Sequence, residues 1–377
     1  MSGYFDFSWT TNHLLYPLLY SISYCIRFYS YKQLSPNQNN PVFFSLIMGF
    51  AEISNILFEL IIIYRTKQKE KRSLKFIVNN EIIKEEKEKK SEHTFSFFLL
   101  IIIVITALLD LFSSVIINYL ITDQAYSLSL ILRITQILFL SLLMRLCLNQ
   151  LFYIHHILSL FIILVSIIAL IILDGNYYKW NFILSYLGSY LLNSIRYILF
   201  KHIIEKYYCS PFIILFKSGI SILIIVSLVI LFSTIENIEL FAFEATIRVP
   251  LTAILENKKG IFYTVLIYLF GIFINGLGLL INQELTPCHL GIADILNALF
   301  LFIVNMIYED KEFLSLLKLI ISIMIFISCL VFTEIVICKC CGLDQFTVKE
   351  IQKRAVDDKE IICQLDEKPL LKNEIIL

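Results

Sequence analysis

Long apolar runs constrain the fold of this chain more than any other feature of its sequence. A helix needs about 20 mostly apolar residues to cross the hydrocarbon core of a bilayer. About ten segments meet this requirement, at residues 13–31, 42–64, 95–120, 126–146, 151–173, 182–200, 212–233, 261–282, 289–307 and 314–338. Only 16% of the residues are charged, against about 25% in soluble domains. The sequence therefore predicts an all-α membrane protein with about ten transmembrane helices.

The distribution of charge predicts the orientation of these helices. The segment 66–93 carries nine Lys or Arg residues and six Glu residues. Loops rich in Lys and Arg stay in the cytosol, so we expect this loop to be cytosolic. Counting spans from it places both termini in the cytosol, as a short N-terminal segment at 1–12 and a polar, disordered tail at 344–377. The net charge is zero, which gives no reason to expect a nucleic-acid partner; the bilayer is the expected environment.

An internal repeat supports the ten-span layout. Asn118 and Thr122 precede Arg133 with the same spacing that Asn282 and Thr286 show before Asn297, at a constant offset of 164 residues. The alternative is a coincidence of common residues. If the repeat is real, residues 13–175 and 176–343 are two five-helix repeats. An odd number of spans inverts the second repeat, a frequent transporter design with its substrate site near the midplane between the repeats.

Charged residues inside apolar runs are the first candidates for a site. Asp110 and Arg133 lie deep in adjacent predicted spans, where a charge is expensive and indicates either function or a structural ion pair. If Arg133 is free, its guanidinium suits a phosphate or carboxylate. We expect Asp294, which lacks a neighbouring Arg, to be unpaired and able to take up a proton. Arg196 lies near a predicted cytosolic end, where extension to the lipid headgroups is the expected role.

Two further spans carry polar faces. Glu52, Asn55 and Glu59 are three and four residues apart and share one helix face. They either face a cavity, where they bind a cation or a proton, or form hydrogen bonds with neighbouring helices. The span at 13–31 is rich in Tyr and Ser. This composition favours a helix that lines a polar cavity, with an interfacial helix as the alternative.

Several segments resemble one family when they are taken together and in order. They are Asn40–Glu52, Leu109–Asp110 with Ser113–Ser114 and Asn118–Leu120, Ser127–Arg133, and Phe273 and Asn275 through Leu285–Thr286 to Asp294 and Asn297. This set, within residues 40–340, resembles the drug/metabolite transporter superfamily, in particular the F subfamily of solute carrier 35, the nucleotide-sugar-transporter-like proteins. The resemblance implies ten transmembrane helices, an EamA-type repeat and transport of a small metabolite across an endomembrane.

The chain departs from that family's pattern at charged positions. Asn297 replaces an Arg of the ninth span, Phe200–Lys201 replaces paired Glu residues, and Ser218–Gly219 replaces a Glu-Gly pair. These changes alter charge at positions suited to gating. They leave the identity of the substrate and of any coupled ion open.

The sequence thus predicts a secondary-active transporter of a small polar metabolite, which is nucleotide-sugar-like if the resemblance holds, working by alternating access. The alternative is a receptor or assembly protein that keeps the fold without transport. No phosphate-binding loop, nucleophile elbow or histidine box is present, so we expect no enzyme, cofactor or metal site. The expected substrate-binding residues are Glu52, Asn55, Asp110, Arg133, Asn275, Asp294 and Asn297.

The C-terminal tail carries two predicted signals. Cys338, Cys340 and Cys341 crowd the end of the last span, a position that favours palmitoylation. Asp366, Leu370 and Leu371 fit an acidic dileucine signal, which adaptor proteins read. A lysosomal, vacuolar or Golgi-like membrane is therefore the expected location.

Overall fold

The computed structural model describes residues 11–34, 40–73, 97–122, 131–148, 152–174, 180–207, 209–235, 243–308 and 312–333. Within these ranges the chain forms helices and no strands. The helices are α1 (Thr11–Lys32), α2 (Pro41–Ser54), α3 (Ile56–Ser73), α5 (Phe97–Thr122), α7 (Gln136–Cys147), α8 (Ile154–Asp174), α9 (Trp180–Tyr207), α10 (Pro211–Ile235), the π-helix η2 (Glu244–Arg248), α11 (Val249–Leu255), α12 (Lys258–Glu284), α13 (Pro287–Tyr308) and α14 (Glu312–Phe332).

Five helical segments are long and apolar enough to cross a membrane, by length and composition, within the described residues. They are Pro41–Thr66, Phe97–Tyr119, Ile154–Leu173, Pro211–Ile235 and Lys258–Glu284. The other predicted spans also coincide with helices, namely α1, α7 with the turn before it, α9, α13 and α14. The segment between the predicted spans 212–233 and 261–282 contains η2 and α11. Residues 245–255 of this segment form a short apolar helix.

Proline and asparagine mark where several helices begin. Asn40 caps α2, because its side-chain oxygen accepts hydrogen bonds from the backbone N–H groups of Val42 and Phe43 at 2.9 and 3.0 Å. Pro41, Pro211 and Pro287 each occupy the first position of a helix, where the missing N–H would have no partner in any case. These signals lie at the ends of the apolar runs, which explains why the predicted positions agree with the helices.

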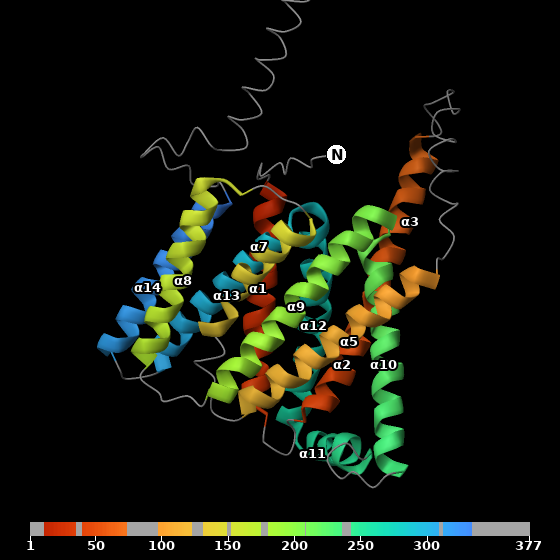
Figure 1. The fold of residues 1–377 in the computed structure, drawn as a ribbon. Coiled ribbons are helices and arrows are strands. Elements are labelled where there is room, and N and C mark those ends of the chain that lie inside the picture. The colour runs from red at the N-terminus through yellow and green to blue at the C-terminus, as the bar shows by residue number, and fades with distance from the viewer. Residues whose placement is uncertain are drawn as a thin grey trace, which may run out of the picture.

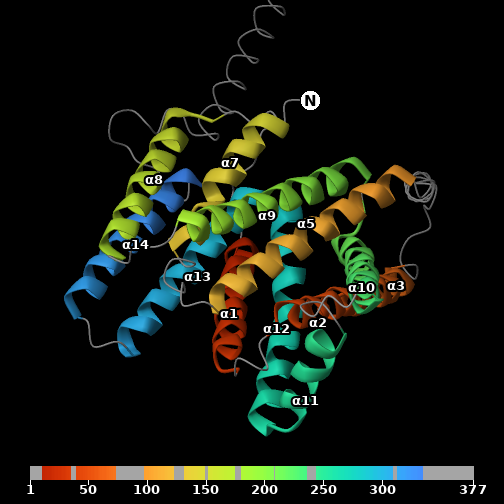
Figure 2. The same cartoon turned by 60° about the horizontal axis from the view of Figure 1, so that its bottom comes forward.

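The helices pack around α1 and α12, which lie side by side in the middle of the molecule (Figures 1 and 2). Helix α1 also contacts α13, α5 packs on α9, and α2 packs on α10 and α12. The pair α8–α14 stands at one side of the molecule, and α3 and α10 stand at the other. Helix α1 therefore lies inside the bundle, as expected for a cavity-lining helix and unlike an interfacial one.

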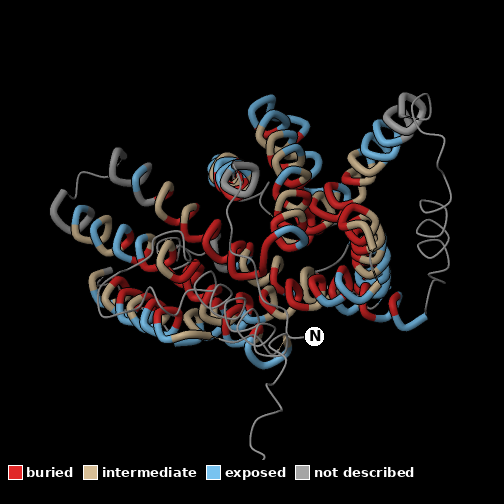
Figure 3. Tube along the Cα trace, turned by 90° about the horizontal axis from the view of Figure 1, so that it is seen from above, coloured by how far each residue is buried: buried red, intermediate tan, exposed pale blue. Residues whose placement is uncertain are grey.

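The outer surface is apolar and the interior contains charge. Helix α8 exposes Ile157, Phe161, Val165 and Ile172 on its outer side, and Figure 3 shows exposed residues along the outer faces of the bundle. Buried positions include Glu52, Arg133, Arg196, Lys201 and Asp294. A soluble protein seldom buries charges of this kind. The arrangement suits helices whose outer faces contact lipid.

Candidate functional site

A buried ion pair joins Arg133 to Asp294. Arg133 is the last helical residue before a turn at residues 134–135, and this turn precedes α7. Its Nε and Nη2 donate to Oδ1 of Asp294, on α13, at 3.0 and 2.5 Å. The two side chains are 10% and 1% exposed. The expectation that Asp294 is unpaired was wrong, because α13 packs against α7 and brings the Arg of one half to the Asp of the other.

Two tyrosines of α1 complete this pair. The Tyr20 hydroxyl donates to the same Asp294 oxygen at 3.3 Å. The Arg133 guanidinium carbon lies 3.5 Å from the centre of the Tyr24 ring, a cation–π geometry. One side chain of α1 thus contacts each member of the pair.

A second buried cluster places Arg196 between two carboxylates. Its Nη2 lies 2.6 Å from Oε1 of Glu52, on α2, and its Nη1 lies 2.6 Å from Oδ1 of Asp110, on α5. The Arg196 side chain is 5% exposed. The interpretation of Arg196 as a headgroup-contacting residue was wrong, and Asp110 pairs with Arg196 and not with Arg133. The cause is the packing of α9 on α5.

These contacts follow from the energetics of buried charge. Removing an ion from water costs several kcal/mol even after the protein relaxes. A charge therefore persists inside the bundle when an opposite charge meets it with good geometry. Arg133 has one carboxylate partner, whereas Arg196 has two, so the two clusters differ in net charge when all groups are ionised.

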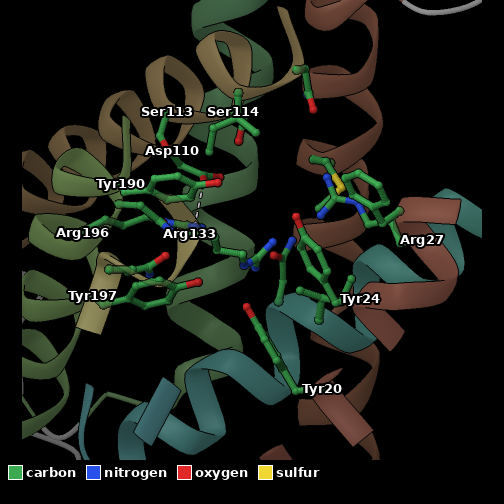
Figure 4. Close-up of a pocket in the computed structure, with 18 of the residues that line it drawn as sticks. Tyr20, Tyr24, Arg27, Asp110, Ser113, Ser114, Arg133, Tyr190, Arg196 and Tyr197 are labelled. Atoms are coloured by element: carbon green, nitrogen blue, oxygen red, sulfur yellow. Dashed lines mark ion pairs between the residues drawn. The ribbon is translucent and has the colours of Figure 1, made fainter. Parts of the chain in front are cut away.

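A polar cavity of about 100 Å³ lies between these clusters and α1 (Figure 4). Its lining comes from α1, α2, α5, α9, α12 and the stretch from Arg133 to Gln136. In Figure 4, Tyr20, Tyr24 and Arg27 face Asp110, Tyr190, Arg196 and Tyr197 across this space. The remaining lining residues are Phe28, Tyr31, Met48, Ser113, Ser114, Ile117, Asn118, Arg133, Gln136, Asn193, Ile274 and Asn275.

The structure places the predicted site residues in different positions. Asp110, Arg133 and Asn275 line the cavity. Glu52 and Asp294 lie behind it, each reaching it through the arginine that it holds.

The two remaining asparagines do not line the cavity. Asn55 lies at the break between α2 and α3, where its Nδ2 donates to the carbonyl oxygen of Ala51 at 3.0 Å. Asn297 is fully buried in α13, and its backbone carbonyl oxygen accepts a hydrogen bond from the Cys25 thiol at 3.9 Å. Glu59, which shares the face of Asn55 in sequence, accepts a hydrogen bond from Ser210.

Sequence reasoning missed the contribution of α1. Tyr20, Tyr24, Arg27 and Tyr31 all line the cavity. Their spacing of four, three and four residues is the repeat of one helix face. That pattern was present in the sequence, within a segment already recognised as unusually polar, and could have identified Arg27.

Lys201 holds the joint between α12 and α13. Its Nζ donates to the carbonyl oxygens of Asn282, Gln283 and Leu285 at 2.9, 3.2 and 3.0 Å, and the residue is only 5% exposed. A cation at the C-terminus of a helix stabilises the carbonyl groups that lack helical partners. The Lys201 position, noted as a departure from the family, thus attaches α9 to the end of α12.

The described residues contain no group of three or more His, Cys, Asp or Glu side chains that could hold a metal ion. The tail residues Cys338, Cys340, Cys341, Asp366, Leu370 and Leu371, and the part of the charged loop between residues 74 and 93, lie outside the described ranges.

Comparison with known proteins adds no family: no protein-family model matches the chain, and no curated protein matches it at a significant level.

Proposed function

We propose that this chain is a secondary transporter of a small polar metabolite, with ten transmembrane helices arranged as two inverted repeats. The observation that carries the proposal is that its buried ion pairs join one half of the chain to the other. Arg133 in the first half pairs with Asp294 in the second half, and Arg196 in the second half pairs with Glu52 and Asp110 in the first. All three contacts border one cavity and join the halves that alternating access would move.

The packing of the helices supports the repeat. The helices of the first half can be matched in order with those of the second: α1, α2–α3, α5, α7 and α8 with α9, α10, α12, α13 and α14. This matching exchanges the packing partners. The contact of α1 with α12 becomes that of α9 with α5, α1 with α13 becomes α9 with α7, and α2 with α12 becomes α10 with α5. The pairs α2–α10, α7–α13 and α8–α14 map onto themselves. A two-fold axis between two halves has this effect.

A matching pair of sequence positions lies where such an axis would pass. Pro41 begins α2 and Pro211 begins α10, and each is followed eight residues later by a glycine, Gly49 or Gly219. A Cβ atom added at Gly219 would lie 2.6 Å from the carbonyl oxygen of Gly49. The two helices thus cross at equivalent residues, as the centre of a repeat requires.

Interrupted helices near the charged residues also support a transport site. The helix across residues 41–73 is interrupted at Asn55, three residues after Glu52, and the helix around Arg133 is interrupted at residues 134–135. In transporters, helix breaks at membrane depth are tolerated where they border a cavity, and they often form the substrate site. Here both breaks adjoin residues of the ion-pair network.

The mechanism follows from these contacts. Opening the cavity to one side requires the halves to separate there, which stretches the ion pairs that join them. An ionic substrate that replaces one partner of an arginine would compensate the exposed charge. The transport cycle would then couple substrate binding to the movement of the halves.

The test is uptake by the full chain in reconstituted vesicles, screened against anionic, zwitterionic, cationic and neutral metabolites, including nucleotide sugars. We expect one class to be taken up above protein-free vesicles, and Arg133→Gln to reduce that uptake. Arg65→Gln, at an exposed position of α3, is the matched control and should keep wild-type uptake. Failure of every class to enter would contradict a transporter.

The second candidate is a non-transporting receptor or assembly protein with the same fold. One observation favours it: Arg133 and Arg196 are already paired with carboxylates, so neither is free for a substrate. A protein that uses its charges only to hold its helices together would look the same. The uptake screen separates the two functions.

The orientation and the location follow the charge pattern. We propose that both termini are cytosolic and that the protein resides in a lysosomal, vacuolar or Golgi-like membrane, with the tail recognised by adaptor proteins. Glycosylation acceptor sites inserted at residues 74–96 and 236–242 test the orientation. We expect modification only at the second site. Modification at the first site would show that the topology is the opposite of the one proposed.

A further inference from the structure

Arg27 is the one arginine bordering the cavity that forms no ion pair with the residues that the structure describes. The carboxylates near the cavity are already engaged, Asp294 by Arg133 and both Glu52 and Asp110 by Arg196. Arg27 lies on the opposite wall, on α1, and its side chain borders the open space (Figure 4). The cavity therefore offers a cation that a ligand can bind without displacing a protein carboxylate.

Two hydrogen-bond donors that border the same space have no partner among the described residues. They are the buried Tyr31 hydroxyl, one helical turn from Arg27, and Nδ2 of Asn118. Tyr31 and Asn118 are 6% and 7% exposed. A buried polar atom without a partner costs about 1–3 kcal/mol, so these donors indicate a polar occupant. Carboxylate oxygens accept hydrogen bonds from such groups and carry the negative charge that would pair with the Arg27 guanidinium.

The remaining observations limit the charge and the size of that occupant. A cation would have to compete with Arg196 for Asp110, the lining carboxylate, which lies 2.6 Å from the guanidinium. The volume of about 100 Å³ is comparable with an engineered cavity of about 150 Å³ that holds benzene. It is well below the roughly 300–1,000 Å³ of pockets for larger ligands. A nucleotide sugar does not fit this space as it stands, whereas a single ring with one acid group is of the right order.

We infer that the cavity binds a small organic monoanion, whose acid group is held by Arg27 and Tyr31 on α1 and by Asn118 on α5. This inference rests on the proposed function only in that it names the substrate class of the same cavity. The site is complete when α1 and α5 lie as they do here. Binding would link α1 to α5, the helix that carries Asp110.

Three planar molecules of nearly equal shape test the inference: benzoate, benzamide and benzamidine, with charges of about −1, 0 and +1 at neutral pH. Binding to the full-chain protein in lipid nanodiscs is measured by calorimetry at millimolar concentrations. We expect benzoate to bind about tenfold or more tightly than benzamide, which is the size of effect that a hydrogen bond to a charged group gives. Benzamidine should not bind measurably.

The variants identify the residue. Arg27→Gln should lower the affinity for benzoate about tenfold or more and remove the preference over benzamide, whereas Arg27→Lys should keep the preference. Arg65→Gln, exposed on α3, should bind as the wild type does. Because Arg27 forms no ion pair within the described part of the chain, the thermal unfolding of Arg27→Gln should match that of the wild type, which would show that the fold is kept.

The inference is overturned if benzoate does not bind, if benzamide or benzamidine binds as tightly, or if Arg27→Gln binds benzoate normally. Exchange of labelled benzoate across reconstituted vesicles separates this result from the proposed function. Binding without exchange would contradict transport and leave the anion site standing. Uptake of another solute class without benzoate binding would do the reverse.

Discussion

Replacing Asp294 by Asn removes the charge that compensates a buried arginine. The Arg133 guanidinium donates two hydrogen bonds to one oxygen of Asp294, and the carboxylate side chain is 1% exposed. Breaking a buried pair from one side costs about 3–5 kcal/mol. The Tyr24 ring, 3.5 Å from the guanidinium carbon, keeps its cation–π contact in both proteins, so this contact does not change the difference. We therefore expect the free energy of unfolding to fall by roughly 3–5 kcal/mol.

A double-mutant cycle separates the pair from its surroundings. Arg133→Met combined with Asp294→Leu replaces the ions by apolar side chains, a change that is often neutral or stabilising for buried pairs. The double variant loses the acceptor of the Tyr20 hydroxyl, about 1 kcal/mol, and the cation–π contact with Tyr24, about 1 kcal/mol. It should therefore be more stable than either Arg133→Met or Asp294→Leu alone in detergent-denaturant unfolding, with a coupling energy of about 2–3 kcal/mol.

The control is the Lys201–Glu205 contact, at 3.5 Å and with Glu205 51% exposed. Glu205→Gln should change the free energy of unfolding by about 0.5 kcal/mol or less. An Asp294→Asn variant no more destabilised than Glu205→Gln would refute a stabilising buried ion pair between Arg133 and Asp294. Additive effects of the two members of the cycle would refute it as well.

Three further variants test other contacts by the same unfolding measurement. Gly219→Ala should destabilise the protein by about 1–3 kcal/mol, because its Cβ would meet backbone of the facing helix at 2.6 Å; Gly188→Ala, with nothing within 4 Å of its Cβ, should not, and equal effects would contradict the close crossing. Lys201→Met should cost about 1–3 kcal/mol, since three buried carbonyl contacts are lost; a neutral change would show that water replaces the lysine. Asp110→Asn should cost less than about 1 kcal/mol, because Arg196 retains its second carboxylate, whereas Arg196→Met should cost about 3–5 kcal/mol; the opposite order would show that Asp110 is the dominant partner.

The positions of the helices could be predicted from the sequence because apolar runs, prolines and capping residues are local signals. The predicted span at 212–233 corresponds to α10, which begins at Pro211. The interruption at Asn55 could not be predicted in the same way. Its turn is set by backbone hydrogen bonds that span three residues instead of four. They run from the Asn55 N–H to the Glu52 carbonyl at 3.2 Å and from the Phe58 N–H to the Asn55 carbonyl at 3.1 Å. An asparagine in an apolar run is compatible with either geometry.

The pairing of the charges could not be predicted, because pairing depends on which helices meet. In sequence, Asp110 is 23 residues from Arg133 and 86 from Arg196, so proximity favoured the wrong partner. Helix packing reverses that order, since α5 lies against α9. The same applies to Arg133, whose partner Asp294 lies 161 residues away. Charged residues in apolar runs identified the network, and only the fold assigned its members.

The two ion-pair clusters have unequal roles in the proposed cycle, and the reason is their stoichiometry. Arg133 and Asp294 neutralise one another, and Tyr20 and Tyr24 enclose them, so separating them exposes two charges at once. Arg196 holds two carboxylates, and losing one still leaves it paired. Asp110 is the more exposed of those two, at 13% against 0% for Glu52, and it borders the cavity opposite Arg27. Movement of the halves should therefore release Asp110 first, while Arg133 and Asp294 keep the halves together.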